Sequence, residues 1–253
     1  MTNRPVDALP AGQPASARIE EMGGDHEGLP EAIKQIVTEA GPVPEFDGYV
    51  SRRVPSLLVV LTGPSGVGKD VTLQRMKERG IPFHYVVTAT TRARRPGEIE
   101  GLHYRFKTRS EFERMKQNNQ LIEHAEVYGN YYGIPRDEVV GPLKRGKDVI
   151  MKPDVQGART MRTIEPEAVY IFLAPPSMED LASRLYHRKT EDPQELARRL
   201  SLAREEMHAL SDFDYVVVNK NGELDDTVDA IEAIIQAEKY RVIPRRLRLL
   251  EQD

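Results

Sequence analysis

The sequence predicts an α/β fold of three layers, in which helices cover both faces of a central parallel sheet. Short, uninterrupted apolar runs alternate with amphipathic segments over residues 57–237. This alternation is typical of strands that are buried on both faces and joined by crossover helices. The first run, residues 57–61, leads directly into a glycine-rich loop. Parallel sheets place their binding sites at the carboxyl ends of the strands, so we expect the loop to lie at the site.

The elements follow from local patterns along the chain. The apolar runs predict five strands, at residues 57–61, 83–87, 148–151, 169–173 and 215–218. Helical periodicity predicts helices at residues 71–77, 193–210 and 224–237. Two more helices are predicted to begin at Ser110 and Ser177, because acidic residues follow each serine in the pattern of a capping box.

Both ends of the chain are expected to lie outside the main domain, which we place at residues 56–240. Residues 1–55 are rich in proline and lack a sustained apolar period, which predicts a flexible extension with one short helix at residues 29–40. Residues 241–253 form a basic tail in which arginines alternate with leucines. The tail could bind nucleic acid or a partner, or it could pack against its own domain.

The composition limits the classes of protein. With 39% hydrophobic and 30% charged residues, the chain is typical of a globular protein. No apolar run approaches the ~20 residues that cross a bilayer. The absence of cysteine excludes disulfides, thiolate metal sites and a cysteine nucleophile. The net charge of -4 argues against nucleic acid as a ligand. We therefore expect a cytoplasmic protein with small-molecule partners; its oligomeric state does not follow from the sequence.

The glycine-rich loop has the spacing of a P-loop. Gly63 and the pair Gly68-Lys69 form the pattern G-x-x-x-x-G-K between a predicted strand and a predicted helix. Glycines allow the backbone N–H groups to turn around phosphate oxygens, and the lysine reaches the β and γ phosphates. The sequence therefore predicts a P-loop NTPase fold. The residues expected to bind the nucleotide are Gly63, Pro64, Ser65, Gly66, Val67, Gly68, Lys69 and Asp70.

The last position of this loop departs from the usual pattern. It normally holds a serine or threonine whose hydroxyl binds Mg²⁺, and here it is Asp70. A carboxylate is a hard oxygen ligand that can hold Mg²⁺ directly. Asp70 is therefore the candidate metal ligand.

Three further segments resemble, in order, motifs of the guanylate kinase family. Residues 88–106 are similar to its T-T-R-x-x-R-x-G-E-x-x-G-x-x-Y-x-F motif, residues 121–133 to its second acceptor motif, and residues 154–157 to its D-x-Q-G element. The resemblance implies phosphorylation of GMP, and of dGMP, by ATP with Mg²⁺, in purine nucleotide metabolism. It also implies a small acceptor-binding α+β insertion at about residues 88–140 and a helical lid at about residues 184–200.

The resemblance implies a role for each residue that matches a family motif. The acceptor's phosphate would be held by Arg92, Arg95, Tyr104 and Tyr132. Guanine would be bound by Glu123, Asp154 and Thr88. The lid arginines that close over ATP would be Arg184, Arg188 and Arg199, and Asn219 would lie near the adenine. The catalytic set would then comprise Lys69, Arg92 and the three lid arginines.

The sequence also departs from the family, which leaves two alternatives open. Lys152 stands where the family has an acid, so Asp70 would either restore a carboxylate near Mg²⁺ or pair with Lys152. A ribose 1,5-bisphosphate kinase, whose phosphate loop tends to read G-K-D, would explain Asp70 but leave Glu123 and Asp154 without a role. A catalytically inactive interaction module would explain the departures as decay, although decay should also have removed Lys69.

Overall fold

The computed structural model describes residues 54–127, 129–187 and 193–251, together with Glu31, Gln35 and Glu39. The chain divides after residue 52 into two units. The predicted N-terminal extension lies almost wholly outside the described residues. Within its predicted helix, Glu31, Gln35 and Glu39 are helical.

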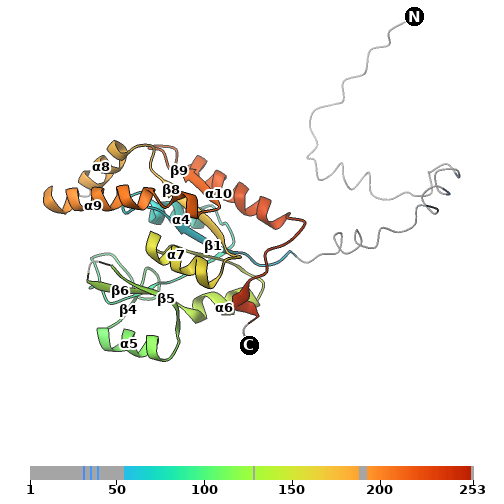
Figure 1. Cartoon of the computed structure of the whole chain (residues 1–253), viewed down its shortest axis with the longest axis horizontal. Coiled ribbons are helices and arrows are strands. Elements are labelled where there is room, and N and C mark those ends of the chain that lie inside the picture. Colours follow the sequence, from blue (N-terminus) through green and yellow to red (C-terminus); the bar gives the residue numbers. More distant parts are fainter. Residues whose placement is uncertain are drawn as a thin grey trace, which may run out of the picture. The chain divides into compact units, whose positions relative to one another are not determined.

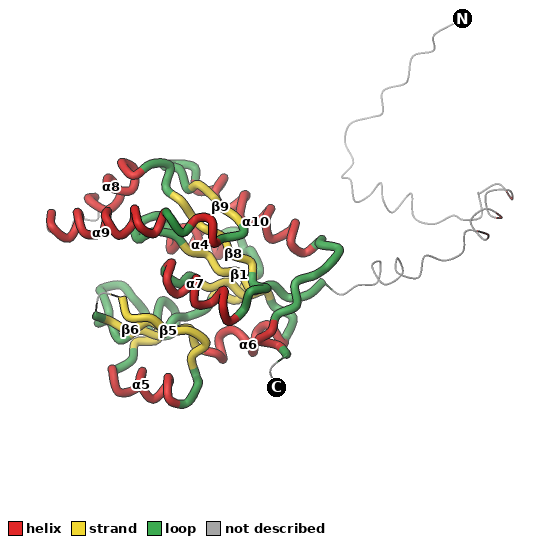
Figure 2. The backbone as a smooth tube through the Cα atoms, in the orientation of Figure 1, coloured by secondary structure: helices red, strands yellow, loops and turns green. Residues whose placement is uncertain are grey.

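A five-stranded sheet forms the centre of the second unit (Figures 1 and 2). All of its strand pairs are parallel. The strand order is β2-β7-β1-β8-β9. The strands are β1 (Leu58–Thr62), β2 (Phe83–Tyr85), β7 (Asp148–Met151), β8 (Val169–Ala174) and β9 (Tyr215–Val218). All five were predicted, and the largest difference in a boundary is at β2, which ends at Tyr85 instead of residue 87.

Alternate residues of β1 point to opposite faces of this sheet. Leu58 and Val60 belong to a buried cluster with α6 (Arg136–Lys144) and α7 (Val155–Ile164). Val59 and Leu61 belong to a second cluster with α4 (Lys69–Glu78) and α10 (Leu224–Lys239). The strand therefore has no polar alternation, because both of its faces are covered. The predicted three-layer fold is confirmed.

A second sheet lies between β2 and α6 in the chain, in the region where an α+β insertion was predicted. Its strand order is β4-β3-β6-β5. The strands are β3 (Ala89–Thr90), β4 (Arg105–Phe106), β5 (Leu121–Val127) and β6 (Asn130–Pro135). Phe112, from α5 (Arg109–Gln117), packs against Ala89 and Leu121 and gives this insertion a small core of its own.

The start of α5 differs from the prediction. The capping box uses Thr108, whose hydroxyl accepts a hydrogen bond from the Glu111 N–H at 3.2 Å. The Glu111 carboxylate accepts in return from the Thr108 N–H at 2.7 Å. The prediction that the box begins at Ser110 was wrong, because a threonine two residues earlier has the same capping chemistry and the correct spacing to a glutamate.

Two packed helices, α8 (Met178–His187) and α9 (Pro193–Met207), occupy the region of the expected lid. Leu181, Leu185 and Ala203 form their shared buried cluster. Ser177 caps α8 as predicted, since its hydroxyl accepts from the Asp180 N–H at 3.0 Å. No helix in the described part of the chain is long and apolar enough to cross a membrane.

The basic C-terminal tail packs against its own domain. Leu247 and Leu249 are buried in the cluster that contains α6 and α7. The Leu249 N–H donates to the Glu165 carboxylate at 2.8 Å. Of the two interpretations left open for the tail, the structure supports packing.

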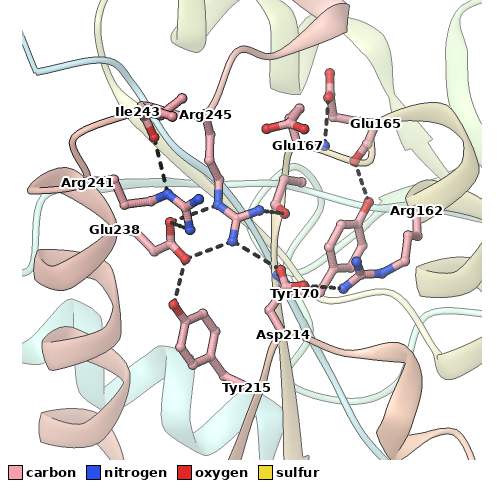
Figure 3. Close-up of polar contacts among 11 residues, drawn as sticks. Arg162, Glu165, Glu167, Tyr170, Asp214, Tyr215, Glu238, Arg241, Ile243 and Arg245 are labelled. Atoms are coloured by element: carbon pink, nitrogen blue, oxygen red, sulfur yellow. Dashed lines mark hydrogen bonds and ion pairs between the residues drawn. The ribbon is translucent and has the colours of Figure 1, made fainter.

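Arg245 anchors this tail (Figure 3). Its guanidinium donates to both carboxylate oxygens of Glu238, at 2.8 and 2.7 Å, and to the Ala168 carbonyl at 3.1 Å. The Glu238 side chain is 0% exposed and also accepts from the Tyr215 hydroxyl at 2.6 Å. The hydrogen bonds from Arg245 lower the pKa of Glu238, so this buried carboxylate is ionised and depends on its partner.

We expect Arg245→Ala to lower the free energy of unfolding by about 3 kcal/mol, because it leaves a buried charge without its main partner. For a chain of this size the melting temperature should fall by roughly 6–12 °C. Thermal denaturation followed by circular dichroism gives the melting temperature of this variant and of its control. Arg246→Ala is the matched control, since Arg246 is the exposed neighbouring arginine. Equal losses in the two variants would contradict the anchoring role.

Candidate active site

A cavity of about 570 Å³ lies at the carboxyl end of the central sheet. It is bounded by the glycine-rich loop, the insertion, the segment after β7 and helix α9. Of the residues predicted from the sequence, those that line it are Gly63, Ser65, Lys69, Thr88, Tyr104, Glu123, Tyr132 and Asp154. The structure thus brings the expected donor and acceptor groups to one cavity.

The backbone conformation of the loop requires glycine at positions 63 and 68. Gly63 has φ 144°, and a Cβ there would lie 2.1 Å from the Leu173 carbonyl oxygen of β8. Gly68 has φ 109° and is the N-cap of α4, so the loop turns directly into the helix. The N-terminus of a helix is a site for anions, because its free N–H groups and dipole favour negative charge.

The side chain of Lys69 folds back toward the start of this loop. Its ammonium donates to the Gly63 carbonyl at 2.5 Å and to the Pro64 carbonyl at 3.3 Å. Burial lowers the pKa of Lys69, and the carboxylates of Glu206 and Asp70 oppose that shift. Within the described part of the chain, the hydrogen bonds of the ammonium go to neutral carbonyls, and the ammonium lies where a P-loop lysine is expected to meet phosphate.

The side chains of Arg184 and Asn219 donate hydrogen bonds to the backbone of the glycine-rich loop and do not line the cavity. The Arg184 guanidinium donates to the Val67 carbonyl at 2.9 Å and to the Asn219 carbonyl at 2.6 Å. The Asn219 side-chain amide donates to the same Val67 carbonyl at 2.8 Å and accepts from the Thr227 hydroxyl at 3.2 Å. In this structure both polar ends of the Asn219 amide hold the loop and its neighbouring helix.

Of the other two expected lid arginines, Arg199 is the one within the described residues. Arg199 lies half-buried on α9, outside the lining of the cavity. Arg188 lies outside the described residues.

Glu123 forms the buried acidic wall of the cavity. Its side chain comes from β5, the residue is 5% exposed, and Oε1 has no hydrogen-bond partner in the described part of the chain. Burial raises the pKa of Glu123 to about 8, and the nearby charge of Asp154 adds to the shift. A buried carboxylate with an open acceptor is suited to a ligand that donates hydrogen bonds.

The D-x-Q-G segment builds the other half of this acidic wall. Asp154 is the N-cap of α7, and its Oδ1 accepts from the Gly157 N–H at 2.7 Å. A Cβ at Gly157 would lie 3.1 Å from Glu123 Oε1. The aspartate is thus oriented by capping, and the glycine leaves room for the glutamate beside it.

Two tyrosines form the side of the cavity at which the acceptor's phosphate was expected. The rings of Tyr104 and Tyr132 lie with centroids 6.3 Å apart, and both line the cavity. The Arg92 guanidinium lies 5.3 Å from the centroid of the Tyr104 ring and pairs with Glu98 at 2.7 Å. Arg95 is exposed, and its backbone N–H donates to the same Glu98 carboxylate at 2.8 Å. Neither arginine lines the cavity in this structure.

Asp70 and Lys152 form an ion pair. Of the two possibilities that the sequence left for Asp70, the structure shows the pairing. Burial alone would lower the pKa of Lys152. The side chains of Tyr104 and Asp70 have a larger, opposite effect, so the pKa is raised and the lysine carries its charge. Asp70 does not line the cavity, whereas Lys152 does.

Sequence reasoning missed the acidic residues that α9 contributes. Glu205 and Glu206 line the cavity with Leu202. Burial raises the pKa of Glu206, and the charge of Lys69 opposes the shift. A signal was present, because Leu202 and Glu206 are four residues apart and therefore share one face of the helix. An acid on the inward face of an amphipathic helix indicates a polar site beneath it.

Comparisons with known proteins agree on one family. The family model described as guanylate kinase matches residues 56–238. Guanylate kinase 2, chloroplastic/mitochondrial, of Oryza sativa subsp. japonica is 46% identical over 194 residues, which cover 76% of this chain and 68% of that protein. The guanylate kinase of Bacillus subtilis (strain 168) is 44% identical over 199 residues, which cover 77% of this chain and 97% of that protein.

A solved structure agrees with these sequences. The crystal structure of guanylate kinase from Anaplasma phagocytophilum matches with a TM-score of 0.61 and 34% sequence identity, over 79% of this chain and 95% of that one. The residues matched by the family model, 56–238, include the P-loop and the acidic wall. Together with the family model and the curated relatives, it shows that this chain belongs to the guanylate kinase family.

Proposed function

We propose that the chain transfers the γ-phosphoryl group of ATP to GMP, with formation of ADP and GDP. The observation that carries the proposal is a single cavity with a P-loop lysine, Lys69, and a buried pair of carboxylates, Glu123 and Asp154. dGMP is expected as a second acceptor, because the residues assigned to the acceptor hold its base and its phosphate and not its sugar.

On the donor side, the loop N–H groups and Lys69 would hold the phosphates of ATP. Within the described residues, no group of three His, Cys, Asp or Glu side chains could hold a metal ion by itself. A phosphate-bound Mg²⁺ needs only one or two carboxylates from the protein, and Asp70, 70% exposed in the first turn of α4, fits that need. When bound, Mg²⁺ would neutralise charge on the β and γ phosphates.

On the acceptor side, the base and the phosphate of GMP would be held by separate groups. Glu123 and Asp154 would accept hydrogen bonds from guanine N1–H and its exocyclic amine, a pair of donors that adenine lacks. Thr88 would contact the same base. The phosphate would be held by Arg92, Arg95, Tyr104 and Tyr132.

The reaction would depend on positioning and on charge neutralisation. The attacking phosphate oxygen is already anionic, so no general base is required. The lid residues Arg184, Arg188 and Arg199 would approach the transferring phosphoryl group when the helical lid closes and excludes water. Asn219 would keep the loop in shape, and adenine would lie against that end of the loop.

The test is an assay of ADP formation with GMP, dGMP, AMP, UMP and ribose 1,5-bisphosphate as acceptors. We expect turnover only with the guanine nucleotides, and its loss when EDTA removes Mg²⁺. Turnover only with ribose 1,5-bisphosphate would show that the chain is a ribose 1,5-bisphosphate kinase instead. If folded protein that binds ATP forms no ADP with any of these acceptors, the result would contradict the proposal and favour an interaction module.

A further inference from the structure

Lys152 lies at the junction of the donor and acceptor sides of the cavity. It directly follows β7, whose Met151 pairs with Val60 of β1. The next residue, Pro153, is held by its carbonyl, which accepts from the Thr62 hydroxyl at 3.0 Å. Two central strands therefore fix the backbone at Lys152 beside the start of the phosphate loop.

The ammonium of Lys152 faces both substrates' binding groups. It pairs with Asp70 of the phosphate loop and lies 5.1 Å from the centroid of the Tyr104 ring on the acceptor side. The same ring has the Arg92 guanidinium 5.3 Å from its centroid. Two cations therefore converge on one tyrosine at the part of the cavity where an acceptor phosphate is expected.

The two members of the ion pair differ in their access to solvent. The Lys152 side chain is 18% exposed, whereas the Asp70 side chain is 70% exposed. Asp70 can turn toward water or a metal ion at little cost, because it is already largely hydrated. A mostly buried ammonium that loses its carboxylate needs another anion in its place. A phosphate that enters the cavity supplies that anion.

We propose that Lys152 is a second phosphate-binding lysine, one that contacts the phosphate of the acceptor nucleotide, and that Asp70 is its counter-ion until the substrates bind. This inference rests on the proposed function, because that function provides a nucleoside monophosphate as acceptor. It assigns to Lys152 part of the role expected of the acceptor arginines Arg92 and Arg95, neither of which lines the cavity in this structure.

The test compares the binding of GMP and guanosine to the ATP-free protein by calorimetric titration. Lys152→Met removes the charge and keeps an unbranched side chain. A charge-assisted hydrogen bond to phosphate predicts that this variant binds GMP about tenfold to a hundredfold more weakly. Guanosine has no phosphate, so its affinity should be unchanged. Lys152→Arg keeps the charge and should retain most of the GMP affinity.

Lys147→Met is the matched control. Lys147 precedes β7 at its opposite end and is exposed, so this variant should bind both ligands as the wild type does. An equal loss of GMP and guanosine binding in Lys152→Met, or no loss of either, would overturn the inference. Lys152→Gln gives the same comparison if the methionine variant does not fold.

The outcome for the wild type separates this inference from the proposed function. If the wild type neither binds nor phosphorylates GMP, the proposed function fails, and the inference fails with it. If the wild type phosphorylates GMP but Lys152→Met keeps the same preference for GMP over guanosine, only the inference fails.

Discussion

Replacing Lys69 with methionine is expected to lower kcat with ATP and GMP by about a thousandfold or more. Lys69 is the only cationic residue among the loop residues 63–70. Its ammonium already lies 2.5 Å from the Gly63 carbonyl, inside the loop where the phosphates would bind. Charge builds up on the transferring phosphoryl group in the transition state, so the loss should be larger in kcat than in KM for ATP.

Lys77→Met makes the matched control for this prediction. Lys77 lies on the same helix, α4, near its C-terminal end, and is exposed. Its activity should stay within about twofold of the wild type, as is usual for surface substitutions. Steady-state kinetics over a range of ATP concentrations separates kcat from KM. A Lys69→Met protein that keeps more than about a tenth of the wild-type kcat would contradict the assigned role.

Local patterns were sufficient to predict the framework of the site. The apolar run at residues 57–61 predicts a strand buried on both faces, and its residues belong alternately to the two buried clusters on either side of the sheet. The spacing of Gly63 and Gly68 predicts the loop because each position needs a backbone conformation that favours glycine. Such signals depend on neighbours in the sequence, so they can be recognised without the fold.

Contacts between distant parts of the chain could not be predicted in the same way. Asp70 and Lys152 are 82 positions apart, and the sequence allowed either a metal ligand or an ion pair. Arg184 lies 117 positions from the Val67 carbonyl that it holds. Each contact depends on how strands and helices are placed side by side, and a local pattern contains no information about that placement.

Glu206 shows a third kind of limit. Its position on the inward face of α9 could be read from its spacing to Leu202, but an inward acid has many structural explanations. Only the fold shows that this face lies over the cavity and that Lys69 is near enough to affect the Glu206 pKa.

Replacing Glu123 with glutamine is expected to lower kcat/KM for GMP by about a thousandfold. Glutamine has nearly the same shape, so the buried site should still fold. Its amide presents one acceptor and one donor, whereas a carboxylate presents two acceptors to guanine N1–H and the exocyclic amine. A donor turned toward N1–H would leave polar groups unpaired in a buried site. The preference for GMP over AMP should therefore fall with it.

The pH dependence gives an independent check on the same carboxylate. Burial and the charge of Asp154 raise the pKa of Glu123 to about 8. Only the ionised form can accept two hydrogen bonds from guanine. Wild-type kcat/KM for GMP should therefore rise by up to about tenfold per pH unit below pH 8 and level off above it.

The same shift has a predictable sign in stability. The folded state keeps the Glu123 proton up to about pH 8, whereas the unfolded chain loses it near the ordinary value of 4.5. Between these pH values the folded state binds more protons, so this group's contribution to stability is full below 4.5 and is lost as the pH rises toward 8. Denaturation midpoints of the wild type should therefore fall relative to those of Glu123→Gln across this interval.

The glutamine variant also separates Glu123 from other groups that titrate in the same range, including the phosphate of GMP. Those groups titrate in both proteins, so the ratio of wild-type to variant kcat/KM isolates the carboxylate. Glu167→Gln, at an exposed glutamate, is the matched control and should follow the wild-type profile. A ratio that does not change with pH would show that Glu123 is ionised throughout. A Glu123→Gln enzyme that still prefers GMP over AMP would remove this residue from guanine recognition and leave that role to Asp154.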